Sequence, residues 1–397
     1  MIHEILMPVR ISIGLGAFSE VASYASSLGS KALIVSDPVM AQIGHVQTCR
    51  NYLEQAGFSC AIYSGVETEP TDRHVDEALA ICRQEQCDVI VALGGGSCID
   101  AAKATAAMMT NTGYIGDYVG GMKKFENRPL PLIAIPTTAG TGSEVTKVTV
   151  IIDTRRDVKM MIAQPELVPQ VAIIDALLCM SCPPSVIVSS GIDALCHAIE
   201  AYWSRKANPL SDGWALQATA LLIKHLPVCY AKKGDAEDFA QIALGSMLAG
   251  AAFSNASVTL IHGMSRPLGA LFHVPHGISN AMLLPAVLEF TSGYAQERIA
   301  EIGRVMRPDL VNSGRDRLST AVMEEVRTLC SLMKIPNLRD WGIEREAFEK
   351  AIPQMASDAI ASGSPGNHPR AVTAGEIEAL YRFCYDYELK KEEGAAR

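Results

Sequence analysis

The chain has 397 residues, 49% of them hydrophobic and 19% charged, with a formal net charge of −9 at pH 7. This length exceeds that of a typical single core and predicts two domains, or three. The acidic balance argues against nucleic acid or an anionic membrane as a partner, and we find no signal peptide and no membrane-spanning apolar run. Eleven scattered cysteines, an odd number, favour reduced thiols, so we expect a cytoplasmic protein.

Five short apolar runs occupy the first part of the chain, at residues 31–37, 59–65, 87–96, 131–138 and 171–178. Such runs are typical of strands buried on both faces of a parallel sheet. Helical periodicity between them, as in residues 73–86, gives a strand–helix alternation. The pattern predicts a doubly wound α/β domain over residues 1–185.

Two glycine-rich turns compete for a phosphate-binding role. Residues 89–110 predict a strand, a GGGS turn and a helix whose free N–H groups suit a pyrophosphate, with Ser97 as the helix cap. The alternative is a plain β–α turn. Residues 14–19, GLGAFS, match the dinucleotide fingerprint incompletely because they end in Ser. We interpret them as a turn that does not bind the pyrophosphate. Asp37 ends a predicted strand, where a carboxylate binds both ribose hydroxyls and repels a 2′-phosphate, which favours NAD over NADP.

Residues 136–146, PTTAGTGSEVT, place hydroxyl side chains directly after a predicted strand. Thr137, Thr138, Thr141 and Ser143 could donate to phosphate or ribose, although a simple loop of small residues is an equal alternative. Cys179 and Cys182 have the CxxC spacing of a redox or zinc pair. No second pair with suitable spacing accompanies them, so we interpret them as structural.

After residues 182–185 the strand-like runs almost disappear and helical periodicity dominates. We predict an all-α domain over residues 186–397. Within it, Asp193 and His197 are four residues apart and share one helical face. His262 and His276 add two nitrogen donors, and the gap between them fits a helix end, a turn through Pro267 and a restart at Pro275.

These four side chains offer one oxygen and three nitrogens. That donor set suits Fe²⁺ or Zn²⁺, is compatible with Ni²⁺ or Co²⁺, and disfavours Ca²⁺ and Mg²⁺. A histidine on an apolar helix is, taken alone, more often a core residue. Four candidates in these contexts favour a metal site.

The chain resembles the iron-containing (group III) alcohol dehydrogenases over nearly its whole length. The resemblance rests on the segments GGGSCIDAAK, PTTAGTGSEVT, GIDALCHAIEAYWS, AGAAFSNASVTLIHGMSRPLGALFHVPHG and GNHPRAVTAGEIEALYR. It implies a dehydroquinate synthase-like fold with a dinucleotide-binding α/β domain, a helical metal-binding domain and the site in the cleft. It also implies that the metal ligands are Asp193, His197, His262 and His276.

The resemblance further implies NAD as the cofactor and Fe²⁺ as the metal, with Zn²⁺ or Ni²⁺ compatible. The implied ribose-binding acid is Asp37, and the implied pyrophosphate loop is Gly95, Gly96 and Ser97. Asp100 is implied to lie near the nicotinamide. The implied further cofactor contacts are Thr137, Thr138, Thr141 and Lys159. Phe253 and Val258, expected on the helix leading to His262, match the substrate pocket, where their bulk implies a small substrate. His273 is a candidate proton relay, with a surface or supporting role as the alternative.

The sequence departs from the family pattern at two places. Many members carry a histidine four residues after the first ligand of the 262–276 segment, where this chain has Arg266. The usual Asn-Pro-Arg near the C-terminus is Asn367-His368-Pro369-Arg370. A guanidinium suits a carboxylate, sulfonate or phosphonate, so Arg266 is a candidate for binding an acidic substrate group. Its alternative role is pairing with a nearby Asp or Glu.

These features predict a metal-dependent, NAD(H)-linked oxidoreductase that interconverts a small primary alcohol and its aldehyde. We also expect a homo-oligomer, a dimer or larger. One alternative is a sugar-phosphate cyclase resembling dehydroquinate synthase, a lyase that needs a basic cluster near the metal, for which only Lys159 and Arg266 are candidates. The other is a structural or filament-forming partner.

Overall fold

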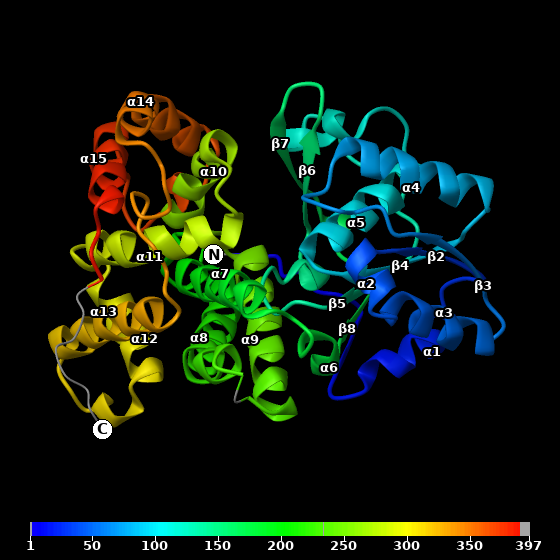
Figure 1. The fold of residues 1–397 in the computed structure, drawn as a ribbon, viewed down its shortest axis with the longest axis horizontal. Coiled ribbons are helices and arrows are strands. Elements are labelled where there is room, and N and C mark those ends of the chain that lie inside the picture. The colour runs from blue at the N-terminus through cyan, green and yellow to red at the C-terminus, as the bar shows by residue number, and fades with distance from the viewer. Residues whose placement is uncertain (1, 233, 390–397) are drawn as a thin grey trace. The chain divides into compact units, whose positions relative to one another are not determined.

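The computed structural model describes residues 2–232 and 234–389, and the chain divides into two compact units, Met1–Cys182 and Pro183–Arg397 (Figure 1). In the described part of the chain, no single helix is long and apolar enough to cross a membrane. Only Ala236–Asn255 and Leu260–Phe272 meet that test, as a pair, and they are bent by 100° to each other.

The first unit is built on a six-stranded sheet whose strands all run parallel, in the order β1-β8-β5-β4-β2-β3. The strands are β1 (Arg10–Ile13), β2 (Lys31–Val35), β3 (Ser59–Tyr63), β4 (Val89–Gly94), β5 (Leu132–Pro136) and β8 (Val171–Ile174). Its helices are α1 (Val21–Ala25), α2 (Pro38–Gln42), α3 (His45–Gln55), α4 (Asp72–Gln84), α5 (Gly96–Thr110) and α6 (Ala176–Cys179). The predicted α/β fold class is confirmed.

The continuous apolar runs arise because both faces of the sheet are covered. Ile34 of β2 packs in a layer with α1 and α3, whereas its neighbours Leu33 and Val35 pack in a layer with α4 and α5. Alternate residues of a strand point to opposite faces, so each strand needs apolar side chains at every position.

Two features of this unit differ from the sequence prediction. The run 171–178 is not one strand: β8 ends at Ile174, because Asp175 caps α6 by accepting the N–H of Leu177 at 3.1 Å. An antiparallel hairpin of β6 (Val148–Asp153) and β7 (Val158–Ala163) was not predicted and packs on α4 and α5.

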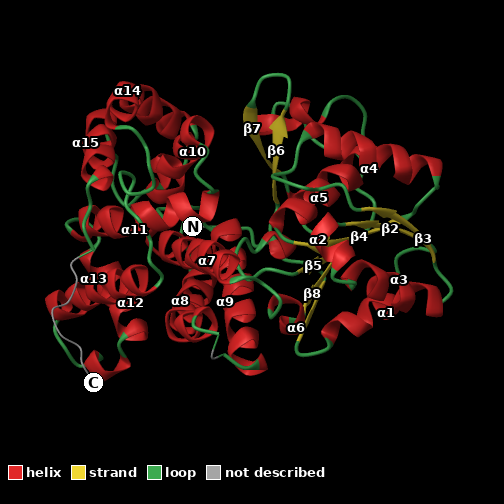
Figure 2. Cartoon of the chain, in the orientation of Figure 1, coloured by secondary structure: helices red, strands yellow, loops and turns green. Residues whose placement is uncertain are grey.

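The second unit contains helices joined by loops and no strand among its described residues, as predicted (Figure 2). Its helices are α7 (Pro184–Trp203), α8 (Pro209–Tyr230), α9 (Ala236–Asn255), α10 (Leu260–Phe272), α11 (His276–Ser292), α12 (Gln296–Met306), α13 (Arg315–Leu332), α14 (Arg345–Ala361) and α15 (Ala374–Tyr385). Helix α7 is buried along most of its length and packs against α8, α9 and α11.

Candidate metal centre and cofactor site

Three polar side chains of α7 share one helical face. Asp193, His197 and Glu200 are spaced i, i+4 and i+7, which places them in one row along the helix. Pro184 at the first helical position starts α7, and all three side chains are buried. The sequence analysis identified the first two residues but not Glu200.

The other two predicted ligands lie at helix starts. His262 is in the first turn of α10 and His276 is the first residue of α11. The expected turn through Pro267 is wrong, because α10 continues past this proline to Phe272. The reversal occurs instead at His273, whose backbone is left-handed with φ 54°.

The structure brings the predicted ligand atoms together. Asp193 Oδ1 lies 3.4 Å from His262 Nε2 and 3.8 Å from His276 Nε2, and the three ligand atoms lie within 4.8 Å of one another. His197 Nε2 is 4.0 Å from the same Asp193 oxygen, and its ring stacks on that of His262 with centroids 4.5 Å apart. Three helices therefore present three donors to one point, and His197 Nε2 lies next to the Asp193 carboxylate of that group.

The electrostatics of this point favour a cation. Burial would raise the pKa of Asp193, but the neighbouring His197, His276 and His262 hold it well below its usual range. Burial lowers the pKa of the His262 imidazole, but the charges of Glu200 and Asp193 and its hydrogen bonds to both raise it to about 9. Two buried carboxylates thus stabilise positive charge between them.

The amide of Asn280, on α11, tests whether these residues fit a metal ion. Its Nδ2 donates to Asp193 Oδ1 at 2.6 Å and lies 3.1 Å from His262 Nε2 and 3.4 Å from His276 Nε2. Two amide protons cannot satisfy three acceptors, and Asn280 Oδ1 is itself buried without a hydrogen-bond partner. Three converging acceptors, one carboxylate and two imidazoles, fit a divalent transition metal such as Fe²⁺ or Zn²⁺.

The predicted substrate residues lie around these ligands in different ways. Phe253 stacks on the outer face of His197, with ring centroids 4.2 Å apart, and belongs to the last turn of α9. Val258 is in the loop after α9, so the expectation that both residues precede His262 on one helix is wrong. Arg266 follows His262 by one turn on α10 and is partly buried, whereas His273 is exposed.

The predicted cofactor segments follow three adjacent strands. Asp37 follows β2, Gly95 and Gly96 follow β4, and residues 137–141 follow β5, and these strands are neighbours in the sheet. The chain adds β3 on one side of β2, then crosses to β4 on the other side and continues through β5 to β8. The switch point of the sheet therefore lies between β2 and β4. Ligands of open α/β sheets bind outside the carboxyl ends of the strands at such a switch point.

The glycine turn and the threonine loop are packed against each other. A Cβ atom at Gly96 would lie 2.6 Å from Thr141 Cγ2, and one at Gly95 would lie 3.6 Å from Thr138. Thr137 donates its N–H to the carbonyl of Gly94 at 3.1 Å. The expectation that Ser97 caps α5 is wrong, because the cap position is Gly95 and Ser97 lies inside the first turn.

The two predicted acids of this site each have an internal partner. Asp37 Oδ1 accepts the N–H of Met40 and so caps α2, while its Oδ2 lies 3.4 Å from the Cys98 thiol. Asp100 accepts from Ser143 Oγ at 2.6 Å and from the N–H of Val150 at 2.8 Å. Both carboxylates are therefore held in fixed orientations.

The competing glycine loop is already occupied by a protein carboxylate. Asp175 accepts the N–H groups of Gly16 at 3.1 Å and Phe18 at 3.0 Å. The amides that a phosphate would need are thus bound internally, which agrees with the interpretation that residues 14–19 do not bind the pyrophosphate.

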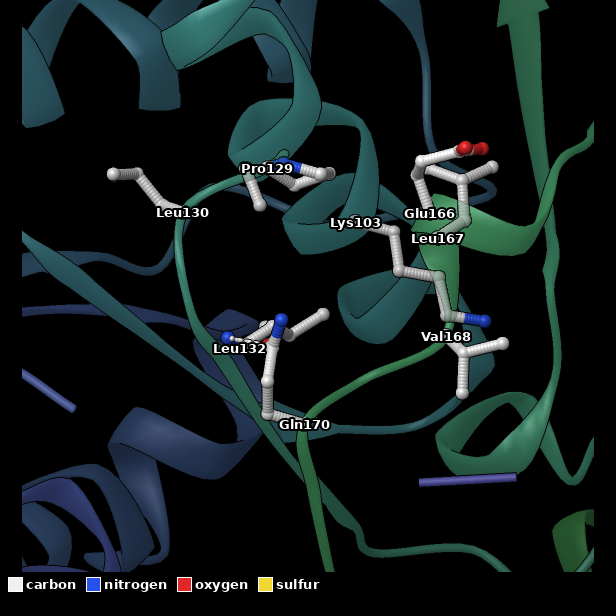
Figure 3. Close-up of a pocket in the computed structure, with 9 residues that line it drawn as sticks. Lys103, Pro129, Leu130, Leu132, Glu166, Leu167, Val168 and Gln170 are labelled. Atoms are coloured by element: carbon white, nitrogen blue, oxygen red, sulfur yellow. Dashed lines mark hydrogen bonds between the residues drawn. The ribbon is translucent and has the colours of Figure 1, made fainter. Parts of the chain in front are cut away.

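Lys159 lies on β7, where its ammonium group is 2.6 Å from Glu69 Oε1. Cys182 donates its thiol to the Thr137 carbonyl at 3.3 Å, and burial raises its pKa to about 11. A small cavity in the first unit, lined by Lys103, Leu130 and Gln170 among others, contains none of the predicted site residues (Figure 3).

Comparison with known proteins gives consistent matches along the chain. A family model described as iron-containing alcohol dehydrogenase matches residues 8–176, and one described as Fe-containing alcohol dehydrogenase family, C-terminal, matches residues 187–385. The 1,3-propanediol dehydrogenase of Klebsiella pneumoniae is 36% identical over 386 residues, covering 96% of this chain and 98% of the relative.

Solved structures match over the same length. A 1,3-propanediol oxidoreductase superposes with a TM-score of 0.92 at 35% identity, covering 97% of this chain and 100% of that one. A sulfoacetaldehyde reductase from Bifidobacterium kashiwanohense, in complex with NAD⁺, gives a TM-score of 0.87 at 28% identity, covering 98% and 100%.

Proposed function

Because the chain belongs to the iron-containing alcohol dehydrogenase family, we propose that it is a metal-dependent, NAD(H)-linked oxidoreductase that interconverts a small primary alcohol and its aldehyde. The observation that carries this proposal is the convergence of Asp193 Oδ1, His262 Nε2 and His276 Nε2 within 4.8 Å. Asp193 and His262 are buried and His276 is partly exposed, so the three donors face a point that a small ligand can reach.

Each group has a role in this chemistry. Asp193, His197, His262 and His276 would hold the metal, which when bound supplies Lewis acidity toward the substrate oxygen while the nicotinamide carries the hydride. Phe253 stacks on His197 and limits the space beside the ligands, which suits a small substrate. The glycine turn of β4 and the N-terminus of α5 would bind the pyrophosphate.

The preference for NAD over NADP rests on Asp37. Its carboxylate lies at the carboxyl end of β2, beside the glycine turn, where it can accept both ribose hydroxyls and repel a 2′-phosphate. The structural relative from Bifidobacterium kashiwanohense, solved with NAD⁺, supports this assignment.

We further propose that the physiological substrate carries an acidic group bound by Arg266. This side chain is one helical turn from His262 and therefore on the same face of α10. Burial lowers the pKa of its guanidinium and the charge of Glu200 opposes that shift. One structural relative reduces sulfoacetaldehyde, an aldehyde with a sulfonate, which supports this substrate class.

Kinetics with a panel of small aldehydes test both proposals. The panel is run with NADH on protein loaded with Fe²⁺ or Zn²⁺ and on metal-free protein. We expect turnover only with metal, and the absence of turnover on every small aldehyde would contradict the proposed reaction.

The role of Arg266 is tested with matched substrates. Arg266→Ala should lower kcat/KM for an acidic aldehyde by about 10- to 100-fold more than for propanal, because a charge-assisted hydrogen bond contributes about 1.5–3 kcal/mol. Arg266→Lys keeps the charge without the paired donors and should fall between the two. An equal loss on both substrates would identify Arg266 as a structural residue that shapes the site.

A further inference from the structure

Glu200 is a buried carboxylate that lies beside the candidate metal ligands and is not one of them. It lies on α7, three residues after His197, and its side chain is inaccessible to solvent. A carboxylate in such a position is stable only if donors satisfy both of its oxygens.

Both oxygens of Glu200 are satisfied by one short segment of the chain. Oε1 accepts from Thr259 Oγ1 at 2.7 Å and from the N–H of Ile261 at 2.7 Å. Oε2 lies 2.5 Å from Nδ1 of His262. The residues 259–262 form the start of α10, so Glu200 binds the first turn of that helix.

Helix α10 depends on this contact because no side chain of its own caps it. The first N–H groups of a helix have no partner within the helix, and a negative charge near them is favourable. Glu200 therefore acts as a cap supplied by α7. It joins the helix that carries Asp193 and His197 to the helix that carries His262.

We propose that Glu200 is a positioning residue for the metal: it holds His262 in the Nδ1–H tautomer with Nε2 turned toward Asp193 and His276. A neutral imidazole that donates from one nitrogen presents a lone pair at the other. Carboxylates behind metal-bound histidines fix ring orientation in this manner, and their loss typically lowers metal affinity about 10- to 100-fold.

A second tier of hydrogen bonds fixes Glu200 in turn. Trp203 Nε1 donates to Thr259 Oγ1 at 2.8 Å, and that hydroxyl donates to Glu200 Oε1. Trp203 is the last residue of α7, so the chain of contacts begins and ends on the same helix. Thr259 thus sets the angle from which Glu200 reaches His262.

This inference rests on the proposed metal site, and binding of Zn²⁺ or Co²⁺ in the absence of NAD and substrate tests it. Glu200→Gln should weaken Zn²⁺ binding about 10- to 100-fold in competition with a chelator. At saturating Co²⁺ the variant should still give the visible absorption spectrum of the wild type, because all four ligands remain. Glu144→Gln is the matched control: it makes the same change at a buried carboxylate of the first unit and should leave Zn²⁺ affinity unchanged.

The variant His262→Ala separates failure of the inference from failure of the proposed function. If it binds Zn²⁺ as tightly as the wild type, the metal site itself is wrong. If it loses Zn²⁺ while Glu200→Gln retains full affinity, only the positioning role is wrong. If Glu200→Gln does not fold, Thr259→Val against Thr259→Ser decides. The valine variant should bind Zn²⁺ several-fold more weakly than the serine variant, and equal affinities would overturn the inference.

Discussion

His262 is the residue on which the geometry of the centre depends most. It contacts Asp193 through Nε2 and Glu200 through Nδ1, and its ring stacks on that of His197. Removing its ring therefore deletes one donor and leaves two buried carboxylates without their shared partner.

We predict that His262→Ala lowers metal affinity by more than about 100-fold, since it removes a direct ligand rather than a supporting group. Turnover should fall with the metal content measured after gel filtration. Full metal content together with full activity would contradict the assignment of His262.

His368 is the residue that this chain has between Asn367 and Pro369, where the family pattern runs directly from Asn to Pro. Its ring is fully buried beside Trp203 and Phe290, and neither ring nitrogen has a hydrogen-bond partner. Burial lowers its pKa to about 4, although Glu200 and Glu376 raise it and Arg370 lowers it further.

This shift makes stability depend on pH in a defined window. The unfolded chain binds a proton at His368 below about pH 6.5, whereas the folded chain does so only near pH 4. The folded state therefore loses stability as the pH falls from 6.5 to 4, by about 3 kcal/mol in total from this residue.

We predict that His368→Phe, which keeps a ring against Phe290, reduces the loss of unfolding free energy between pH 6.5 and 4. Urea titrations of both proteins at several pH values measure the difference. His273→Asn, at an exposed position whose left-handed backbone suits Asn, is the control and should follow the wild type. Parallel pH dependences for His368→Phe and the wild type would refute the assignment.

At the scale of elements, the residue that caps α2 is also the residue that we propose selects the cofactor. Asp37 ends the segment after β2 and accepts the N–H of Met40, so it caps α2 while its other oxygen lies beside the glycine turn. Asp37→Gly would remove the charge and weaken the cap together. Asp37→Ser removes the charge and keeps a capping oxygen.

We predict that Asp37→Ser raises the ratio of kcat/KM with NADPH to that with NADH by about 10- to 100-fold, because the repelling carboxylate is gone. The thermal unfolding temperature should stay near that of the wild type, whereas Asp37→Gly should lower it. A wild-type protein that already prefers NADPH would show that Asp37 does not select the cofactor.

At the scale of the whole molecule, the metal ion and NAD are predicted to bind to different units of the chain. The candidate metal ligands all lie in Pro183–Arg397, and the candidate cofactor contacts all lie in Met1–Cys182. Each unit has its own hydrophobic interior. Because a ligand stabilises the part of the chain that it binds, each ligand should leave a separate footprint.

We predict that Zn²⁺ slows hydrogen exchange in α7 and in the starts of α10 and α11, and that NAD⁺ slows it in residues 94–100 and 137–143. At 100 times the dissociation constant the stabilisation is about 2.7 kcal/mol. His262→Ala should abolish the Zn²⁺ footprint and leave that of NAD⁺. Protection of residues 94–100 by Zn²⁺ alone would contradict the assignment of the two sites.

The features that could be predicted from the sequence are those that local periodicity encodes. Continuous apolar runs predicted the parallel strands, and helical spacing predicted the second unit and the shared face of Asp193 and His197. Residue types predicted the rest of the ligand set, since His262 and His276 stand out in a chain with nine histidines. The periodic signals lie within a few residues of one another, so one sequence is enough to read them.

The contacts between distant segments could not be predicted and depend on how the chain packs. Glu200 meets His262 across 62 positions and Asn280 meets Asp193 across 87, and neither residue type is unusual enough to be noticed in the sequence. Pro267 stays inside α10, and Asp175 fills the loop at Gly16, because packing and hydrogen bonds from other elements outweigh local preference. The ligands follow from residue chemistry, whereas their supporting partners follow from the way helices and strands meet in space.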